Sequence, residues 1–197
     1  MELKNTNKKE DYRLEIIKKT RELVSRFGYK KTSTEEIARS LNRTKASLYH
    51  YFKSREDILR AAVEYEGSII LDNIKNGLKS ETCPEKKIRT FFLIRADNIY
   101  KLGKFYKQVR EEYFNRYSFI MEALKDYNIE ELQILKEIID EGIERGMFKT
   151  PDTTLSAKAI IKSLKAYDFF IFQGEQLKEL QSELNEALNI FIKGIKK

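Results

Sequence analysis

The chain has 197 residues, enough for one large domain or two small ones with a buried core. Its single cysteine excludes an intrachain disulfide, and no apolar run approaches the roughly 20 residues that span a bilayer. The net charge of +7 lies in residues 1–60, which hold 16 Lys and Arg against 9 Asp and Glu, whereas residues 61–197 hold 22 of each sign. This distribution favours a polyanion-binding segment joined to a neutral part, although a solvated lysine-rich surface would give the same counts.

Helix-forming residues dominate, and the two prolines and eight glycines interrupt few stretches, which predicts an all-α fold of about nine helices. An apolar stripe runs from Leu14 to Phe27, so we expect the first helix to end at Gly28, which readily adopts a left-handed conformation. Ser33 and Glu36 then have the spacing of a capping box and predict a short second helix.

A third helix is expected from Thr44 to Phe52, after a turn at Asn42, a residue that tolerates positive φ. Leu48 and Phe52 are four residues apart and would pack inward. Two short helices joined by a tight turn have the helix-turn-helix arrangement, in which the second helix enters the major groove of DNA.

A long fourth helix is expected from a second capping box, Ser54 and Asp57, to about Leu78. A loop at Cys83-Pro84 and a bend at Gly103 follow. The apolar periodicity then predicts further helices, which cover about residues 85–100, 104–127, 129–145, 154–172 and 177–195. We expect a DNA-binding domain over residues 1–53 and a second helical domain over residues 54–197.

The outer face of the third helix would gather hydrogen-bond donors. It carries Lys45, Ser47, Tyr49 and His50, the last being the only histidine of the chain. Such donors suit phosphate oxygens and base edges. A single histidine among rings is more often an ordinary packed or surface residue, but here it belongs to a coherent motif, so we expect contact with DNA.

The segment "TSTEEIARSLNRTKASLYHYFKSREDIL" resembles the DNA-binding region of TetR-type bacterial transcriptional repressors. The resemblance covers about Leu14–Leu59 and rests on the Ile37-Ala38 pair, the Lys45–Lys53 segment and the helix start after it. Ile138–Phe148 is a second, weaker match to the end of a late helix in the regulatory domain. The chain departs from the family at "NRTKA", where "GVSKG" is usual, so Arg43 replaces a valine.

This resemblance implies a homodimer that binds an inverted-repeat operator on double-stranded DNA and is released by a small-molecule effector. The residues expected at the DNA are Ser33, Thr34, Glu35, Arg43, Thr44, Lys45, Ala46, Ser47, Tyr49, His50 and Lys53. Dimerisation would use the last two helices, with apolar stripes that contain Ile160, Leu164, Tyr167, Ile171, Leu184, Leu188 and Phe191. These stripes are wide enough to serve either a buried core or a dimer seam.

The effector would bind among the rings that crowd residues 91–119. Each ring alone is more readily explained as ordinary core, but together they could line an apolar cavity with a few polar anchors. The expected contacts are Phe92, Arg95, Tyr100, Tyr113, Arg116 and Tyr117. An anionic effector would use Arg95 or Arg116 and a cationic one Asp97 or Glu112, and the sequence leaves this choice open.

Catalysis is disfavoured because the chain has no metal-ligand spacing, no Gly-rich phosphate loop and no second histidine. We therefore expect no enzyme, no catalytic residue, no metal and no cofactor. The polar N-terminal residues do not resemble a signal peptide, so a cytoplasmic location without a membrane partner is expected. Two alternatives remain: a regulator that binds DNA constitutively without an effector, and a helical membrane-surface or scaffold protein that places its basic end on anionic lipid.

Overall fold

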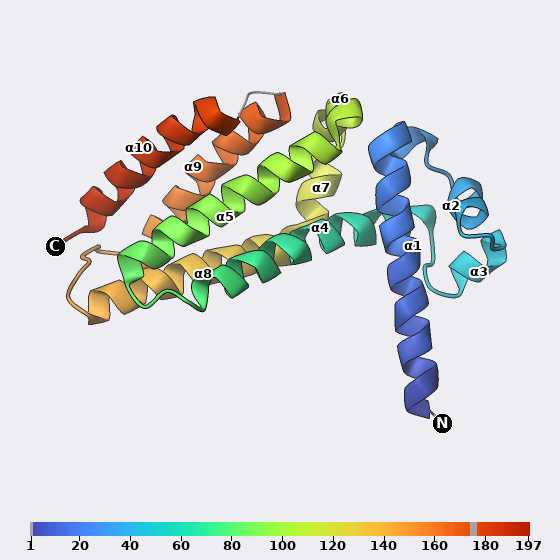
Figure 1. The fold of residues 1–197 in the computed structure, drawn as a ribbon, viewed down its shortest axis with the longest axis horizontal. Helices are drawn as coiled ribbons and strands as arrows, with labels where there is room; N and C mark the ends of the chain where they lie inside the picture. The colour runs from blue at the N-terminus through green and yellow to red at the C-terminus, as the bar shows by residue number, and fades with distance from the viewer. Residues whose placement is uncertain (1, 174–176) are drawn as a thin grey trace. The chain divides into compact units, whose positions relative to one another are not determined.

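The computed structural model describes the backbone of residues 2–173 and 177–197, and their side chains except for residues 2–8, 109, 110, 113, 114 and 177–179. In these residues every regular element is a helix, apart from one isolated β-bridge between Phe148 and Lys196 (Figure 1). The all-α prediction is therefore confirmed. None of the described helices is both long and apolar enough to cross a membrane.

The helices divide into two compact units. Unit 1 comprises the residues up to Gly67 together with Tyr106–Lys125, and unit 2 comprises Ser68–Phe105 together with the residues from Asp126 onward. Unit 1 contains α1 (Glu2–Lys31), α2 (Thr34–Ser40), α3 (Lys45–Tyr49), the start of α4 (Arg55–Leu78), a 3-10 turn (Lys107–Val109), α6 (Arg110–Asn115) and α7 (Tyr117–Ala123). Unit 2 contains the rest of α4, α5 (Pro84–Phe105), α8 (Lys125–Glu144), α9 (Thr153–Gln173) and α10 (Leu177–Ile195).

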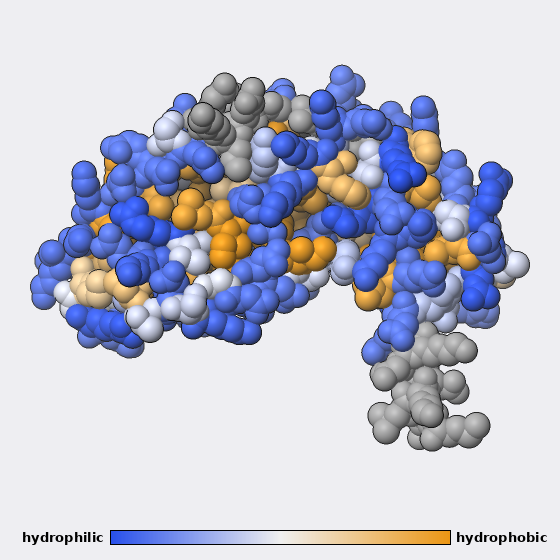
Figure 2. All heavy atoms as spheres, viewed as in Figure 1, coloured by the Kyte–Doolittle hydropathy of each residue, from blue (hydrophilic) through white to orange (hydrophobic). Residues whose placement is uncertain are grey.

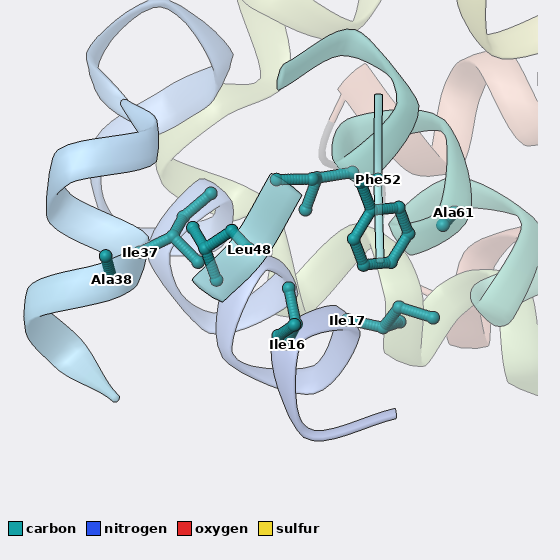
Figure 3. Close-up of a cluster of buried hydrophobic side chains, with 8 residues drawn as sticks. Ile16, Ile17, Ile37, Ala38, Leu48, Phe52 and Ala61 are labelled. Atoms are coloured by element: carbon teal, nitrogen blue, oxygen red, sulfur yellow. The ribbon is translucent and has the colours of Figure 1, made fainter. Parts of the chain in front are cut away.

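One apolar cluster in unit 1 holds the first three helices together. Ile16 and Ile17 of α1, Ile37 and Ala38 of α2, and Leu48 of α3 point toward one another, with Phe52 and Ala61 beside them (Figure 3). Leu48, Ile16 and Ile37 are fully buried. Because burying a side chain of this size stabilises the fold by about 1.5–3 kcal/mol, these contacts fix the orientation of α3 on α1 and α2.

The predicted signals at the ends of α2 are confirmed. The Glu36 N–H donates to Ser33 Oγ, and the Ser33 N–H donates to Glu36 Oε2, which completes the capping box. Asn42 adopts a φ of 53°, the only positive φ among the described non-glycine residues. The turn between α2 and α3 is thus set by local chemistry.

Several predicted helix limits are wrong. The helix expected over about residues 104–127 is divided into the 3-10 turn, α6 and α7, and α8 begins at Lys125. The third helix ends at Tyr49 instead of Phe52, because the Tyr51 N–H donates to the carbonyl three residues back, that of Leu48, as in a turn. The bend expected at Gly103 is absent, because α5 continues to Phe105 and Gly103 packs closely on α9. A Cβ at this position would lie 3.1 Å from Cγ2 of Ile171, so the glycine allows the two helices to approach.

In unit 2, α5 packs against α9 and α10, which also pack against each other (Figure 1). The end of α8 explains the second sequence match. Gly146 adopts a φ of 69°, and the chain turns so that the buried Phe148 ring lies against Gly142, where a Cβ would overlap the ring.

We predict that Gly142→Ala lowers the free energy of unfolding by about 1–3 kcal/mol, because the added methyl group forces the buried Phe148 ring out of place. Gly194→Ala in α10 is the matched control, since nothing lies within 4 Å of the place that its Cβ would take and alanine favours a helix. Urea denaturation followed by circular dichroism measures both. Equal stabilities for the two variants would contradict the role given to Gly142.

Candidate nucleic-acid interface

The exposed face of α3 carries the donors that the sequence predicted. Lys45 and His50 are exposed, Tyr49 is 45% exposed, and Leu48 on the opposite face is fully buried. Thr44 caps the helix, since its Oγ1 accepts from the Ser47 N–H at 3.3 Å. The Ser47 hydroxyl donates to the Thr44 carbonyl at 2.6 Å, so a DNA contact would have to redirect it.

The remaining predicted DNA residues lie around α2 and the two turns. Arg43, Ala46 and Lys53 are exposed. Ser33 is half-buried and serves as the cap of α2, whereas Thr34 is buried, with its hydroxyl 3.2 Å from Glu35 Oε2. The two residues at the start of α2 thus have structural partners already, while Arg43 and Lys53 present their side chains at the surface.

Lys45 and Glu35 form an ion pair between α3 and α2. Both side chains are exposed, at 46% and 55%. The hydrogen bond from Lys45 lowers the pKa of Glu35, and the same bond raises the pKa of Lys45, so both groups stay charged at neutral pH. A phosphate that binds Lys45 must therefore compete with a carboxylate of the same chain.

The segment Tyr106–Lys125 contributes contacts to unit 1 that the sequence did not reveal. Glu112 of α6 accepts hydrogen bonds from the backbone N–H groups of Tyr29 at 2.7 Å and Lys30 at 3.3 Å. Gly28 has a φ of 83°, and a Cβ there would lie 2.5 Å from Glu112 Oε1, so only glycine fits. The hydrogen-bonded partners are 83 and 82 residues apart in the chain, which no local pattern can signal.

A buried polar cluster lies in the same unit. Arg21 of α1 pairs with Glu66 of α4, and the Tyr106 hydroxyl donates to Glu66 Oε1 at 2.9 Å. Glu66 is only 7% exposed, and burial raises its pKa. Two carboxylates, Glu66 and Glu112, thus join α1 to parts of the chain that follow the motif.

Comparisons with known proteins agree with this geometry. Residues 16–62 match the family described as bacterial regulatory proteins, tetR family, and residues 100–197 match the C-terminal region of QacR-like proteins. The chain is a TetR-type transcriptional regulator. The helix-turn-helix of α2 and α3 is accordingly its DNA-binding motif, and the chain is not an enzyme.

Relatives of this TetR-type regulator support the assignment. A fatty acid metabolism regulator protein of Bacillus subtilis is 23% identical over 188 residues, which span 92% of this chain and 94% of the relative. A transcriptional regulator from Cytophaga hutchinsonii has the same fold, with a TM-score of 0.74, 21% identity and coverage of 92% and 97% of the two chains. The fatty acid degradation regulator FadR from Bacillus halodurans aligns with a TM-score of 0.69 and 22% identity over 89% and 93%.

The side chains predicted for an effector of this TetR-type regulator are divided between the units. In unit 2, Phe92 and Arg95 are buried and Tyr100 is half-buried. In unit 1, the Arg116 guanidinium lies 5.6 Å from the centre of the Tyr29 ring, and Tyr117 is 51% exposed. The Tyr113 side chain lies outside the described residues.

Arg95 is the centre of a buried ion cluster of α5, α8 and α9. Its Nε donates to Glu131 Oε1 at 2.6 Å, and its two terminal nitrogens donate to the two oxygens of Asp168 at 2.7 Å each. The Tyr127 hydroxyl also donates to Glu131 Oε1, at 2.5 Å. Burial raises the pKa of Asp168 and lowers that of Lys165. An anionic effector would reach Arg95 only by displacing one of its carboxylates.

A groove in unit 2 runs along α5 and α10, and Figure 2 shows hydrophobic residues at the surface around the middle of α5. Its lining includes Phe92, one of the expected effector contacts, and Asp97, the residue named for a cationic effector. The groove is lined by Phe92, Leu93, Ala96, Asp97, Gln181, Leu184, Asn185 and Leu188.

Among the described residues, no three His, Cys, Asp or Glu side chains are grouped as metal ligands would be.

Most residues predicted for the dimer seam face the core of their own unit. The buried ones are Ile160, Leu164, Ile171, Leu184 and Leu188, and the half-buried ones are Tyr167 and Phe191. Other apolar side chains of the same two helices are exposed: Leu155 by 63%, Phe169 by 48%, Phe170 by 42% and Ile190 by 61%. A partner that contacts α9 and α10 would meet these four first.

We predict that Glu35→Gln tightens the binding of duplex DNA by roughly 3- to 10-fold, because Lys45 then has no carboxylate that competes with phosphate. The slope of log affinity against log salt should steepen by about one, as for one added phosphate contact. Fluorescence anisotropy over a salt series measures both. Glu22→Gln, which removes the same charge from the exposed Lys19 pair on α1, is the control. Identical salt slopes for Glu35→Gln and Glu22→Gln would contradict the prediction.

Proposed function

We propose that this protein is a homodimeric repressor that binds an inverted-repeat operator and is released by a small, largely apolar effector. The observation that carries the DNA-binding part is the exposed donor face of α3, which a buried Leu48 holds in place. The concentration of the positive charge in residues 1–60 supports it, because contacts with phosphate supply much of the affinity for DNA. Residues 1–53 would supply these contacts, and residues 54–197 would carry the effector and dimer functions.

The dimer is supported by the four exposed apolar side chains of α9 and α10. Large exposed apolar side chains on one pair of helices are typical of an interaction surface. Two copies are also what an inverted repeat requires, since two reading helices must meet two half-sites roughly 34 Å apart. We therefore propose that the seam uses Leu155, Phe169, Phe170 and Ile190 in addition to the predicted stripes.

The effector class is proposed from the relatives. Proteins that regulate fatty acid metabolism in Bacillus subtilis and fatty acid degradation in Bacillus halodurans align with nearly the whole chain. An acyl chain is apolar, which suits the many rings of residues 91–119. Fatty acids are accordingly the first effectors to test.

The DNA-binding proposal is tested by selection of duplexes from a randomised pool with the full chain. We expect the selected sequences to share an inverted repeat. The alternative in which the basic end binds anionic lipid predicts instead that vesicles rich in anionic phospholipid retain the protein and that no duplex sequence is enriched.

We predict that Leu155→Lys combined with Phe170→Lys converts the dimer to a monomer, because like charges cannot be buried in an apolar seam without partners. Sedimentation equilibrium measures the mass, and binding to the inverted repeat should fall by at least about 10-fold when one half-site is lost. Ile129→Lys is the matched control, since Ile129 is 59% exposed but lies on α8. A double variant that remains a dimer would refute this seam.

We predict that operator DNA weakens the binding of the effector by the same factor by which the effector weakens the binding of DNA, typically about 5- to 150-fold. Isothermal titration of fatty acids of graded chain length, with and without operator, measures the coupling. Tyr117→Ala should reduce the response and spare the affinity for DNA. Equal affinities in the two titrations would favour the alternative of a constitutive regulator.

A further inference from the structure

Arg43 occupies the turn between α2 and α3, where the family pattern has a valine. Its backbone N–H donates to the Ala38 carbonyl at 2.9 Å, which ties the turn to α2. Its side chain is exposed, and the guanidinium carbon lies 5.5 Å from the centre of the Tyr12 ring. The Arg43 side chain therefore contacts an aromatic ring of α1.

Tyr12 is itself held from two further directions. Its ring meets Tyr51 edge to face, with 5.1 Å between the ring centres. Its hydroxyl oxygen lies 3.5 Å from Ser47 Oγ of α3, and the side chain packs against the apolar cluster around Leu48. The ring thus provides a fixed surface that contacts both the turn before α3 and the helix itself.

Arg43 and Lys45, the two cations beside Thr44, differ in whether a carboxylate of the same chain already neutralises them. Lys45 is paired with Glu35, whereas no carboxylate among the described residues lies within ion-pair distance of Arg43. The guanidinium has five N–H donors, and a contact of its carbon with a ring does not neutralise them, so they can still bind the oxygens of a phosphate. Arg43 is therefore a charged group that is already partly ordered and not yet neutralised.

We propose that Tyr12 is a positioning residue for DNA binding, which holds Arg43 ready to contact a backbone phosphate at the start of α3. Binding normally costs the conformational entropy of a long side chain that becomes ordered, and the contact with the Tyr12 ring removes part of this loss beforehand. The proposal rests on the DNA-binding function, gives Arg43 a phosphate contact and adds Tyr12, which lies on α1, outside the helix-turn-helix.

The experiment measures the affinity of the full chain for a duplex of about 30 base pairs and mixed sequence, over a salt series, because phosphate contacts do not depend on sequence. Arg43→Gln should flatten the slope of log affinity against log salt by about one. Tyr12→Leu should lower the affinity roughly 2- to 5-fold and keep the slope, as expected for the loss of one exposed cation–π contact. The double variant should bind as Arg43→Gln alone does.

Two matched variants complete the design. Tyr12→Phe keeps the ring and should bind almost as the wild type does. Arg60→Gln removes an arginine of α4 that rests on Phe119 at the same distance, 5.5 Å, and should leave the slope unchanged. Because Arg43 is exposed, Arg43→Gln tests the phosphate contact even where Tyr12→Leu loosens α1, which thermal unfolding would reveal.

An unchanged salt slope for Arg43→Gln would overturn the phosphate contact. A loss of affinity from Tyr12→Leu that is equally large with and without Arg43 would overturn the positioning role, since Tyr12 would then act through the fold. Failure of the wild type to bind any duplex at low salt would refute the proposed function itself and is thereby distinguished from both results.

Discussion

The burial of Leu48 is the contact on which the nucleic-acid interface depends. The helix α3 has only five residues, far fewer than an isolated helix needs in water, because nucleation costs more than a few hydrogen bonds return. It is helical because Thr44 caps its start and Leu48 fills the space between Ile16 and Ile37. Once that side chain is buried, the direction of Lys45, Tyr49 and His50 follows from helical geometry.

Helices that lie outside the motif also support it. Tyr12 of α1 contacts the turn and α3, and Glu112 of α6 accepts hydrogen bonds from two backbone N–H groups just after Gly28. The chain of α1 is kinked at Gly28, whose φ and ψ are not helical, and the N–H groups after the kink need other acceptors. A carboxylate is a strong acceptor for such N–H groups. The helix-turn-helix is therefore the exposed part of a larger unit whose members are distant in sequence.

The distance between partners along the chain explains what the sequence could predict. Features that depend on neighbouring residues can be predicted. They are the capping box of Ser33 and Glu36, the cap at Thr44, which acts on a residue three positions later, and the positive φ of Asn42. Glu112 with Tyr29 and Arg95 with Asp168 are separated by 83 and 73 residues. Their pairing depends on how the helices pack, which a single sequence does not encode locally.

The apolar stripes of α9 and α10 illustrate a different limit. Periodicity locates the buried face of a helix but does not tell whether its own chain or a second copy covers it. Leu164 and Leu188 lie in the core of the protomer, so the exposed Phe169, Phe170 and Ile190 became visible as a surface only in the structure. A helix that lies between its own core and a partner must be apolar on two faces. The sequence alone does not tell which face meets the core and which meets the partner.

The two parts of the chain also differ in net charge, and the difference follows from where their charged groups find partners. Residues 61–197 hold equal numbers of acids and bases, and several are buried together, with Arg95 bound to both Glu131 and Asp168. Buried charges must be neutralised by partners, since an isolated ion costs several kcal/mol or more to remove from water. In residues 1–60 the cations outnumber the acids, so a surplus of positive charge is left for a polyanion to neutralise, although some cations such as Lys45 are paired. Arg43, whose guanidinium lies over the Tyr12 ring and is not paired with a carboxylate among the described residues, has a charge that such a partner would neutralise.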